Sequence, residues 1–367
     1  MMSDIDASAK LILENISAAA ATILSRVSIA RCCIAIKKLD SSKAADQMKN
    51  LANDFPVHPA APTLLLGANG FIGSGIRRAF GQTRPSIPLR LAARQKIQPT
   101  AESSVAEVGL APFDFRRTDL LAEAIRGAEA VIVATSYLGA DQELSRAVNL
   151  DLVRTVIEIS RESEIQRLVY VSTAAVHGRG PFRGSDLRQL GYAPTSFRSR
   201  DRATADRMVL DAGGTVVRPQ LILGAGDRWV MPGMSALLRA LGGMPLAGAA
   251  KVSAIHVDRL GGLVAALAQR GSPGAYAAAE LEPVSIAELA RSFGERVGLE
   301  LPTAPLALAA ARDIAAGRRL GSSALEMLCH DSWFDASGTF EATGLNPAPR
   351  EFFDPATADW YRGLLAG

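Results

Sequence analysis

The chain has 367 residues, of which 48% are hydrophobic and 21% are charged, a composition typical of a globular protein that buries a core. Its 40 basic and 37 acidic side chains give a formal net charge of +3, which argues against a nucleic-acid-binding protein. The three cysteines, Cys32, Cys33 and Cys329, form neither a disulfide framework nor a metal-binding spacing. We therefore expect a cytoplasmic protein with reduced thiols and no metal site.

The N-terminal region (residues 1–55) differs from the rest of the chain. Its apolar stretch, residues 16–36, is interrupted by Arg26 and Arg31, and charges at that depth are costly in a bilayer, so no membrane span is expected. Acidic residues precede the stretch, unlike a secretion signal. We expect a helical extension, or alternatively a helix that binds a membrane surface or a partner. The Pro-rich segment 56–62 is expected to be a linker.

A short apolar run and three glycines follow the linker. Residues 63–66 (TLLL) predict a buried parallel strand, and the next residues follow the spacing G-x-x-G-x-x-G before a helix. In this context the first glycine permits a tight turn, the second admits a pyrophosphate, and the third allows the helix to pack on the strand. The motif predicts dinucleotide binding, against a glycine-rich turn without a ligand. The expected cofactor contacts are Gly67, Asn69, Gly70, Phe71, Ile72 and Gly73.

The second strand, predicted at residues 88–94, indicates which dinucleotide is bound. Enzymes that prefer NAD carry an acidic residue at the end of this strand, whereas no Asp or Glu occurs between Asp54 and Glu102. Arg94 stands at the strand end instead, and an arginine suits the 2′-phosphate of NADP. We therefore predict NADP(H) over NAD(H), the alternative being a solvated arginine.

Strands and helices continue to alternate downstream. A helix is predicted over residues 119–126 and a strand over 130–135, followed by a further helix and the strand of "RLVYVSTAAVHG". Such alternation predicts an α/β fold with a doubly wound parallel sheet, a Rossmann fold.

With these motifs on view, the chain from about residue 62 onward resembles the extended short-chain dehydrogenase/reductase family of the NAD-dependent epimerase/dehydratase type. The resemblance rests on the glycine motif, Asp114-Phe115, Asn149, "VYVSTAAVHG" and several later segments, including "VVRPQLILGAGD", "AIHVDRLGGLVAAL" and "VSIAELARSFGERVG". It implies a Rossmann domain over residues 63–367 whose smaller substrate lobe is formed by about 223–245 and 283–367.

The resemblance also implies roles for single residues. Thr173 occupies the position of the catalytic Ser or Thr, whose hydroxyl bonds the substrate oxygen. The residues implied to lie along the cofactor are Asp114 and Phe115 near the adenine, Ala134 and Thr135 after the fourth strand, and Arg218 near the nicotinamide.

The catalytic Tyr-x-x-x-Lys of the family is replaced in this chain. Alignment on the helix of "TSFRSRDRATAD" puts Arg198 in the tyrosine position and Arg202 in the lysine position. Arginine stays protonated and is a poor general acid, although Arg202 could still bind the cofactor ribose. Tyr192, six residues earlier, and His177 are alternative proton donors, each with a purely structural alternative.

Two functions follow from these observations. The first is an NADP(H)-dependent oxidoreductase or epimerase whose small-molecule substrate is anionic and resembles a sugar or nucleotide sugar, because seven arginines and three aspartates lie between residues 179 and 207. The second is a non-catalytic, redox-sensing or scaffolding relative that binds NADP(H). A homodimer is a further expectation from the resemblance.

Overall fold

The computed structural model describes residues 61–83, 87–97, 107–110, 113–318, 322–347 and 351–366. The predicted helical extension (1–55) and nearly all of the predicted linker (56–62) lie outside these residues, as do Cys32 and Cys33. No helix in the described ranges has the length and apolar character needed to cross a bilayer.

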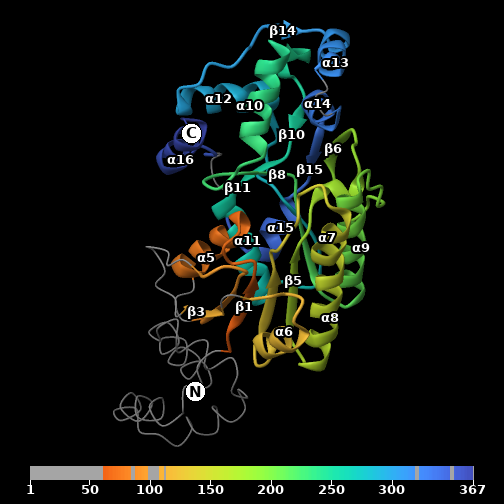
Figure 1. The fold of residues 1–367 in the computed structure, drawn as a ribbon, viewed down its shortest axis with the longest axis vertical. Helices are drawn as coiled ribbons and strands as arrows, with labels where there is room; N and C mark the ends of the chain where they lie inside the picture. The colour runs from red at the N-terminus through yellow and green to blue at the C-terminus, as the bar shows by residue number, and fades with distance from the viewer. Residues whose placement is uncertain are drawn as a thin grey trace, which may run out of the picture. The chain divides into compact units, whose positions relative to one another are not determined.

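A seven-stranded sheet lies at the centre of the fold (Figure 1). Its strand order is β3-β2-β1-β4-β5-β7-β12, and every neighbouring pair is parallel. The chain order therefore reverses direction between β1 and β4, which is where such sheets bind ligands. The strands are β1 (Thr63–Leu66), β2 (Leu89–Ala92), β3 (Glu107–Leu110), β4 (Ala130–Val133), β5 (Arg167–Val171), β7 (Thr215–Pro219) and β12 (Gly274–Ala278).

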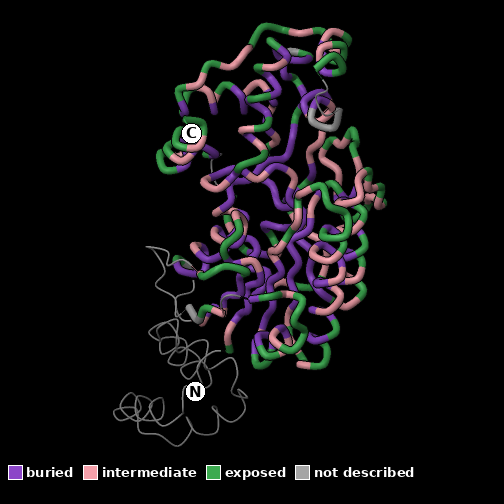
Figure 2. The backbone as a smooth tube through the Cα atoms, in the orientation of Figure 1, coloured by how far each residue is buried: buried purple, intermediate pink, exposed green. Residues whose placement is uncertain are grey.

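Helices cover both faces of this sheet, and Figure 1 shows α5 and α11 on one side and α6, α8 and α9 on the other. Two apolar cores fill the space between the layers, one under each set of helices. Figure 2 shows the buried residues running through the sheet between the helix layers. The helical segments here are α5 (Phe71–Thr83), α6 (Thr118–Ile125), α7 (Gln142–Arg146), η1 (Ala147–Asp151), α8 (Leu152–Glu162), η2 (Ala174–His177), α9 (Phe197–Asp211), α11 (Val257–Arg270) and α15 (Ser337–Thr343).

A third core forms a smaller lobe from residues 221–254, 284–329 and 352–361. A four-stranded sheet of order β13-β10-β15-β6 and two strand pairs, β11-β8 and β14-β9, accompany it. The remaining elements are β6 (Phe182–Ser185), β8 (Leu221–Leu223), α10 (Val230–Leu241), β9 (Met244–Pro245), η3 (Leu246–Gly248), β10 (Lys251–Val252), β11 (Ala254–His256), β13 (Val284–Ser285), α12 (Ile286–Val297), β14 (Pro305–Leu306), α13 (Leu308–Gly317), α14 (Ser322–Cys329), β15 (Ser332–Phe334) and α16 (Pro355–Ala366).

The predicted fold class is confirmed, since a parallel sheet covered on both faces is accompanied by smaller C-terminal sheets.

Two segments cross between the large sheet and the smaller lobe. β6, from the middle of the chain, pairs with β15 in the lobe sheet, whereas Phe340 of α15 returns to the core beneath the large sheet. The smaller lobe is therefore tied to the large sheet by strands and helices exchanged in both directions.

Candidate functional site

The glycine turn between β1 and α5 is tightly packed against the end of β4. Gly67 has a φ of +93°, which favours glycine, and a Cβ there would lie 3.0 Å from the backbone of Ala134. A Cβ on Gly73 would overlap the carbonyl oxygen of Gly67. The first and third glycines of the motif are thus required by close backbone contacts, as the sequence predicts.

Gly70 is less confined than the other two glycines of the motif. A Cβ there would meet a single heavy atom within 4 Å, the carbonyl oxygen of Gly67 at 3.2 Å, and both Asn69 and Gly70 are exposed. The turn leads directly into α5, whose unpaired N–H groups and dipole favour an anion at this end. The open side of Gly70 is therefore where a pyrophosphate can approach the backbone.

Asn69 connects the glycine turn to the loop that follows β2. Its side-chain amide donates to the backbone oxygens of Gln95 and Lys96, both at 3.1 Å. These bonds hold the exposed Arg94 and Lys96 beside the turn, and no described carboxylate forms an ion pair with either of them. Lys96 was not predicted as a site residue, and its place two residues after Arg94 is the only sequence pattern that points to it.

The basic residues on α5 lie elsewhere. The guanidinium of Arg78 donates to the Asp258 carboxylate of α11 at 2.7 Å, and Arg77 is buried, with 3% of its surface exposed. The cations available at the end of β2 are therefore those of the loop, Arg94 and Lys96.

Asp114 and Phe115 lie in the turn after β3, which is joined to the end of β2 by the bond from Phe113 N to Ala93 O at 2.8 Å. Arg116 donates to both carboxylate oxygens of Asp114, at 3.1 and 3.2 Å, and these bonds lower the pKa of Asp114. The rings of Phe113 and Phe115 are tilted against each other at 5.4 Å. The predicted adenine contacts therefore stand near the loop of Arg94.

Two polar atoms at the carboxyl ends of β4 and β5 have no partner. Thr135 Oγ1 and Arg202 Nε are both buried and make no hydrogen bond to a described residue. Their position beside Ala134, at the reversal of strand order, is where a dinucleotide would pass. Unpaired buried polar atoms are rare in folded proteins, so this pair, together with the open Gly70, fits an NAD(P) molecule bound along this edge.

Thr173 follows β5 and stands at the start of the short helix η2. Its Oγ1 accepts a hydrogen bond from Ala175 N at 3.2 Å, so it caps that helix. The hydroxyl proton is not used by this bond, and the residue is only partly buried. The side chain can thus cap the turn and donate to a substrate oxygen at the same time.

Arg198 and Arg202 lie one helical turn apart on α9, which starts after Ser196 with a capping box. Arg198 Nη1 donates to the carbonyl oxygen of Gly139 at 2.8 Å. Arg202 donates to Val171 O at 2.8 Å and to Ser136 Oγ at 3.2 Å. Both guanidinium groups are therefore turned toward the loop after β4 and the end of β5.

Tyr192 and Arg218 belong to a hydrogen-bond network around the buried Asp206. Asp206, which is fully buried, accepts bonds from Ser172 Oγ and Tyr192 Oη, both at 2.5 Å, and from Arg218 Nη2 at 2.6 Å. Burial and the Asp206 carboxylate raise the pKa of Tyr192. The predicted roles of Tyr192 as a proton donor and of Arg218 beside the nicotinamide gain no support from this arrangement, because both side chains hold α9 against β5 and β7.

His177 is buried beside the same network and stacks on the Tyr192 ring at 5.7 Å. Its Nδ1 lies 3.0 Å from the carbonyl oxygen of Gly191, so Nδ1 carries the proton in the neutral ring. Burial lowers its pKa. Nε2 is buried and makes no bond to a described group, and in this tautomer it is an acceptor.

Most arginines between residues 179 and 207 have contacts within the chain. Arg183 and Arg188 pair with aspartates, at 2.7 and 2.9 Å, and Arg207 lies over the Tyr192 ring at 4.3 Å. With the contacts of Arg198 and Arg202, at least five of the seven serve internal contacts. The predicted anion site therefore has fewer available cations than the sequence suggests.

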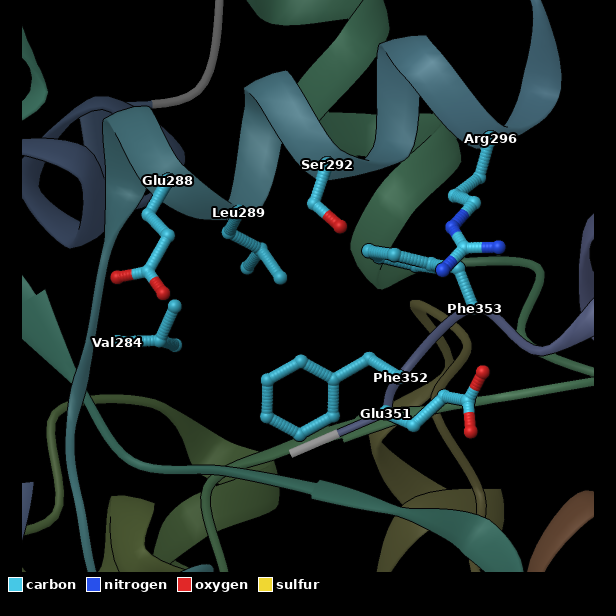
Figure 3. A pocket seen from close by; sticks show the side chains of 8 residues that line it. All are labelled: Val284, Glu288, Leu289, Ser292, Arg296, Glu351, Phe352 and Phe353. Carbon is cyan, nitrogen blue, oxygen red and sulfur yellow. The ribbon is translucent and has the colours of Figure 1, made fainter. Parts of the chain in front are cut away.

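Figure 3 shows a pocket in the small lobe, between α12 and the segment before α16. It contains none of the predicted site residues. The lining residues are Val284, Glu288, Leu289, Ser292, Arg296, Glu351, Phe352 and Phe353.

Among the described residues, no group of three or more His, Cys, Asp or Glu side chains is arranged to hold a metal ion.

The sequence of this chain is similar to one known protein family and to individual known enzymes. Residues 64–263 match the model of the 3-beta hydroxysteroid dehydrogenase/isomerase family. The 4-hydroxy-2-methyl-3-oxo-4-farnesyl-3,4-dihydroquinoline-1-oxide ketoreductase of Stigmatella aurantiaca is 30% identical over 182 residues, 46% of this chain and 53% of the relative. The decarboxylating sterol-4-alpha-carboxylate 3-dehydrogenase of Saccharomyces cerevisiae is 24% identical over 187 residues, 47% of this chain and 54% of the relative. The chain thus spans about half the length of these curated relatives.

Solved structures share the fold at lower identity. The dTDP-glucose 4,6-dehydratase of Bacillus anthracis, in complex with NAD, is similar with a TM-score of 0.63 and 17% identity, covering 83% of this chain and 97% of that one. The UDP-glucuronic acid 4-epimerase of Bacillus cereus, also with NAD, has a TM-score of 0.61 and 15% identity, covering 83% and 99%. At these identities the likeness concerns the fold.

Proposed function

Since the chain belongs to the 3-beta hydroxysteroid dehydrogenase/isomerase family, we propose that it is an NAD(P)(H)-dependent oxidoreductase that interconverts an alcohol and a ketone. The observation that carries the proposal is the edge formed by β1 and β4. There Gly70 is exposed, and Thr135 Oγ1 and Arg202 Nε are buried without a hydrogen-bond partner among the described residues, which suits a dinucleotide.

The chemistry assigned to this edge uses few side chains. The bound dinucleotide would supply or accept a hydride. Arg202 would hold the ribose as a fixed cation, and Thr173 would donate its hydroxyl proton to the substrate oxygen as a hydrogen bond, which stabilises the charge that develops there. An epimerase would use the same groups, because epimerisation also begins by oxidising an alcohol.

NADP(H) is the preferred cofactor in this proposal. Arg94 and Lys96 are exposed on a loop that Asn69 ties to the glycine turn, and no carboxylate is present in the described part of that loop. Two cations at the end of β2 would attract a 2′-phosphate, whereas an aspartate would repel it. Arg78 of α5 does not bind the 2′-phosphate in this proposal, because its guanidinium donates to the Asp258 carboxylate.

The substrate class is a narrower proposal. The internal contacts of the arginines around α9 favour an uncharged ketone over a sugar-like anion. One curated relative is named for a quinoline-oxide ketone, which agrees with an uncharged ketone, whereas another is named for a sterol carboxylate, which carries an acidic group. A nucleotide sugar, as first predicted, stays the alternative.

A second candidate function is a dinucleotide-binding protein without turnover. The observation that favours it is the pair Arg198 and Arg202, which gives α9 no group able to release a proton near neutral pH.

A cytoplasmic location and a homodimer through the outer helices α8 and α9 are further predictions of the main proposal.

The test measures NADPH oxidation by the purified full-length chain with a panel of polycyclic ketones and nucleotide sugars. We expect turnover with an apolar ketone, and loss of at least about tenfold in kcat in Thr173→Val, since the lost donor served the transition state. Dinucleotide binding without turnover by any ketone or sugar would favour the second candidate.

A further inference from the structure

Reduction of a ketone requires a proton for the substrate oxygen, and α9 does not provide one. Arg198 and Arg202 occupy the positions where the resemblance places an acid and its cation, and a guanidinium is not deprotonated in proteins. Thr173 can donate a hydrogen bond, but an alkyl hydroxyl is too weak an acid to release its proton to the product. The proton must come from a different element.

The five tyrosines of the chain all lie within the described residues, and four of them are committed elsewhere. Tyr170 is buried, with 1% of its surface exposed. The hydroxyls of Tyr192 and Tyr361 donate to buried aspartates, and Tyr276 Oη donates to a backbone carbonyl at 2.9 Å. Tyr137 differs from all four, because it is only half-buried and its hydroxyl donates to no described acceptor.

Histidine does not replace tyrosine at this edge of the sheet. His177 is the histidine nearest to Thr173 in the chain, at the other end of η2. Its Nδ1 proton is used by the carbonyl oxygen of Gly191, which leaves the neutral ring with no proton on Nε2. Burial favours that neutral ring and lowers its pKa.

Tyr137 lies in the loop that follows β4, three residues after Ala134. Asn149 clamps its backbone from both sides, accepting from Tyr137 N at 2.9 Å and donating to Tyr137 O at 3.0 Å. Asn149 itself is 1% exposed and lies in the π-helical turn η1, a feature that is frequent at functional sites. The loop is therefore held in place beside the cofactor edge.

The phenol of Tyr137 lies against the part of the loop that the arginines of α9 contact. A Cβ on Gly139 would overlap its hydroxyl, and Gly139 O accepts from Arg198 Nη1 at 2.8 Å. The hydroxyl accepts a bond from Asp141 N at 3.3 Å, which leaves its own proton available. Half-buried Tyr137 thus brings an acidic hydroxyl next to the vacated tyrosine position.

We propose that Tyr137, on the loop after β4, is the proton donor of this site and replaces the tyrosine that α9 lacks. The inference rests on the proposed oxidoreductase function. As the carbonyl carbon gains a hydride from the bound dinucleotide, the O–H bond of Tyr137 breaks and its proton passes to the carbonyl oxygen, which gives the alcohol. The phenolate is then protonated by water, and the reverse transfers accompany alcohol oxidation. Arg198 and Arg202 stabilise the transient negative charge.

The experiment compares Tyr137→Phe with the matched control Tyr276→Phe in the full-length chain. We expect kcat with the best ketone to fall about 100-fold or more in Tyr137→Phe, as for loss of a general acid, while the NADPH-induced rise in melting temperature stays as in the unmodified chain. Tyr276→Phe should retain its activity. A Tyr137→Phe variant whose kcat lies within about threefold of the unmodified chain, below any general-acid effect, overturns the proposal.

A rescue variant separates a chemical role from a structural one. In Tyr137→Phe/Arg198→Tyr the phenol returns to α9, and we expect at least about a tenfold gain in kcat over Tyr137→Phe, a partial return of the general-acid effect. A merely structural role in the loop would not be rescued from α9, so absence of a gain contradicts the proposal.

A third measurement needs no substrate. Tyrosine nitration by tetranitromethane, mapped by mass spectrometry, should be slowed at Tyr137 by saturating NADP⁺ and unchanged at Tyr276. Equal nitration of Tyr137 with and without the dinucleotide, in a chain whose melting temperature does respond to it, overturns the assignment of Tyr137 and leaves the proposed function intact. Absence of any melting-temperature response would instead count against the proposed function.

Discussion

The buried ion pair between Asp206 and Arg218 offers a direct test of how α9 is held in place. The carboxylate and guanidinium lie 2.6 Å apart, with 0% and 2% of their side chains exposed. Asp206→Ala would leave the Arg218 charge buried without its partner, which costs about 3–5 kcal/mol of the free energy of unfolding. Ser172 and Tyr192 would also lose the acceptor of their hydroxyl protons, so the upper part of this range is expected.

Urea denaturation followed by circular dichroism measures this loss. The double variant Asp206→Leu/Arg218→Met removes both charges, and we expect it to recover much of the loss, since a buried pair replaced by apolar groups is often tolerated. Asp119→Ala, which removes an exposed partner of Arg117, is the control and should leave the midpoint nearly unchanged. A loss of less than about 1 kcal/mol in Asp206→Ala, the size expected of a surface pair, would refute the assignment of a buried, structural network.

Three further predictions concern the cofactor edge and pH. Gly70→Ala places a methyl group where the pyrophosphate approaches. It should raise the Kd of NADPH at least about tenfold, or 1.4 kcal/mol, with an unchanged melting temperature of the free protein. Equal Kd values for the variant and the unmodified chain would contradict pyrophosphate binding at the glycine turn. Arg94→Ser should weaken NADPH more than NADH in calorimetric titration, and a parallel loss for both would contradict a 2′-phosphate contact. Burial lowers the pKa of His177 from its ordinary 6.5, so the unfolded chain binds a proton that the folded chain does not. The stability due to His177 is therefore complete above pH 6.5 and is lost as the pH falls below it. His177→Gln should flatten the fall in urea midpoint over that window, and an identical pH profile would refute this origin.

Local patterns were sufficient to predict the parts of the fold that depend on neighbours in the chain. The run of residues 63–66 is buried on both sides of β1, and its predicted bounds are confirmed. The glycine spacing correctly places Gly67 and Gly73 at close backbone contacts, because each contact is made within the same strand-turn-helix unit. The resemblance to the extended short-chain dehydrogenases is likewise confirmed by the family match.

Contacts between distant segments were beyond such patterns. A Cβ on Gly75 would lie 2.5 Å from the backbone of Val257, so α5 and α11 approach closely at a glycine that the motif does not include. The pairing of Tyr192 and Arg218 through Asp206 joins three elements, and no periodicity in the sequence places them together. For the same reason Tyr137 did not stand out, since its significance depends on what α9 presents to its loop.

Helix α9 illustrates how a scaffold can be held by residues other than those in its predicted catalytic positions. The helix α9 keeps its capping box at Ser196 and its buried face at Ala203 and Asp206, in addition to the bond from Arg202 to Val171 O of β5. The fold therefore constrains where the chemistry occurs and leaves open which side chain performs it.

Calorimetric titration of the full-length chain with NADPH, and separately with NADH, tests the central claim most directly. The proposal predicts saturable binding of NADPH that is tighter than that of NADH. It also predicts a gain of about 2.7 kcal/mol in unfolding free energy at a hundredfold excess over Kd. Absence of binding by either dinucleotide, in a folded preparation, would contradict the account, because the open face of Gly70 and the unpaired atoms at the ends of β4 and β5 would then have no ligand to explain them.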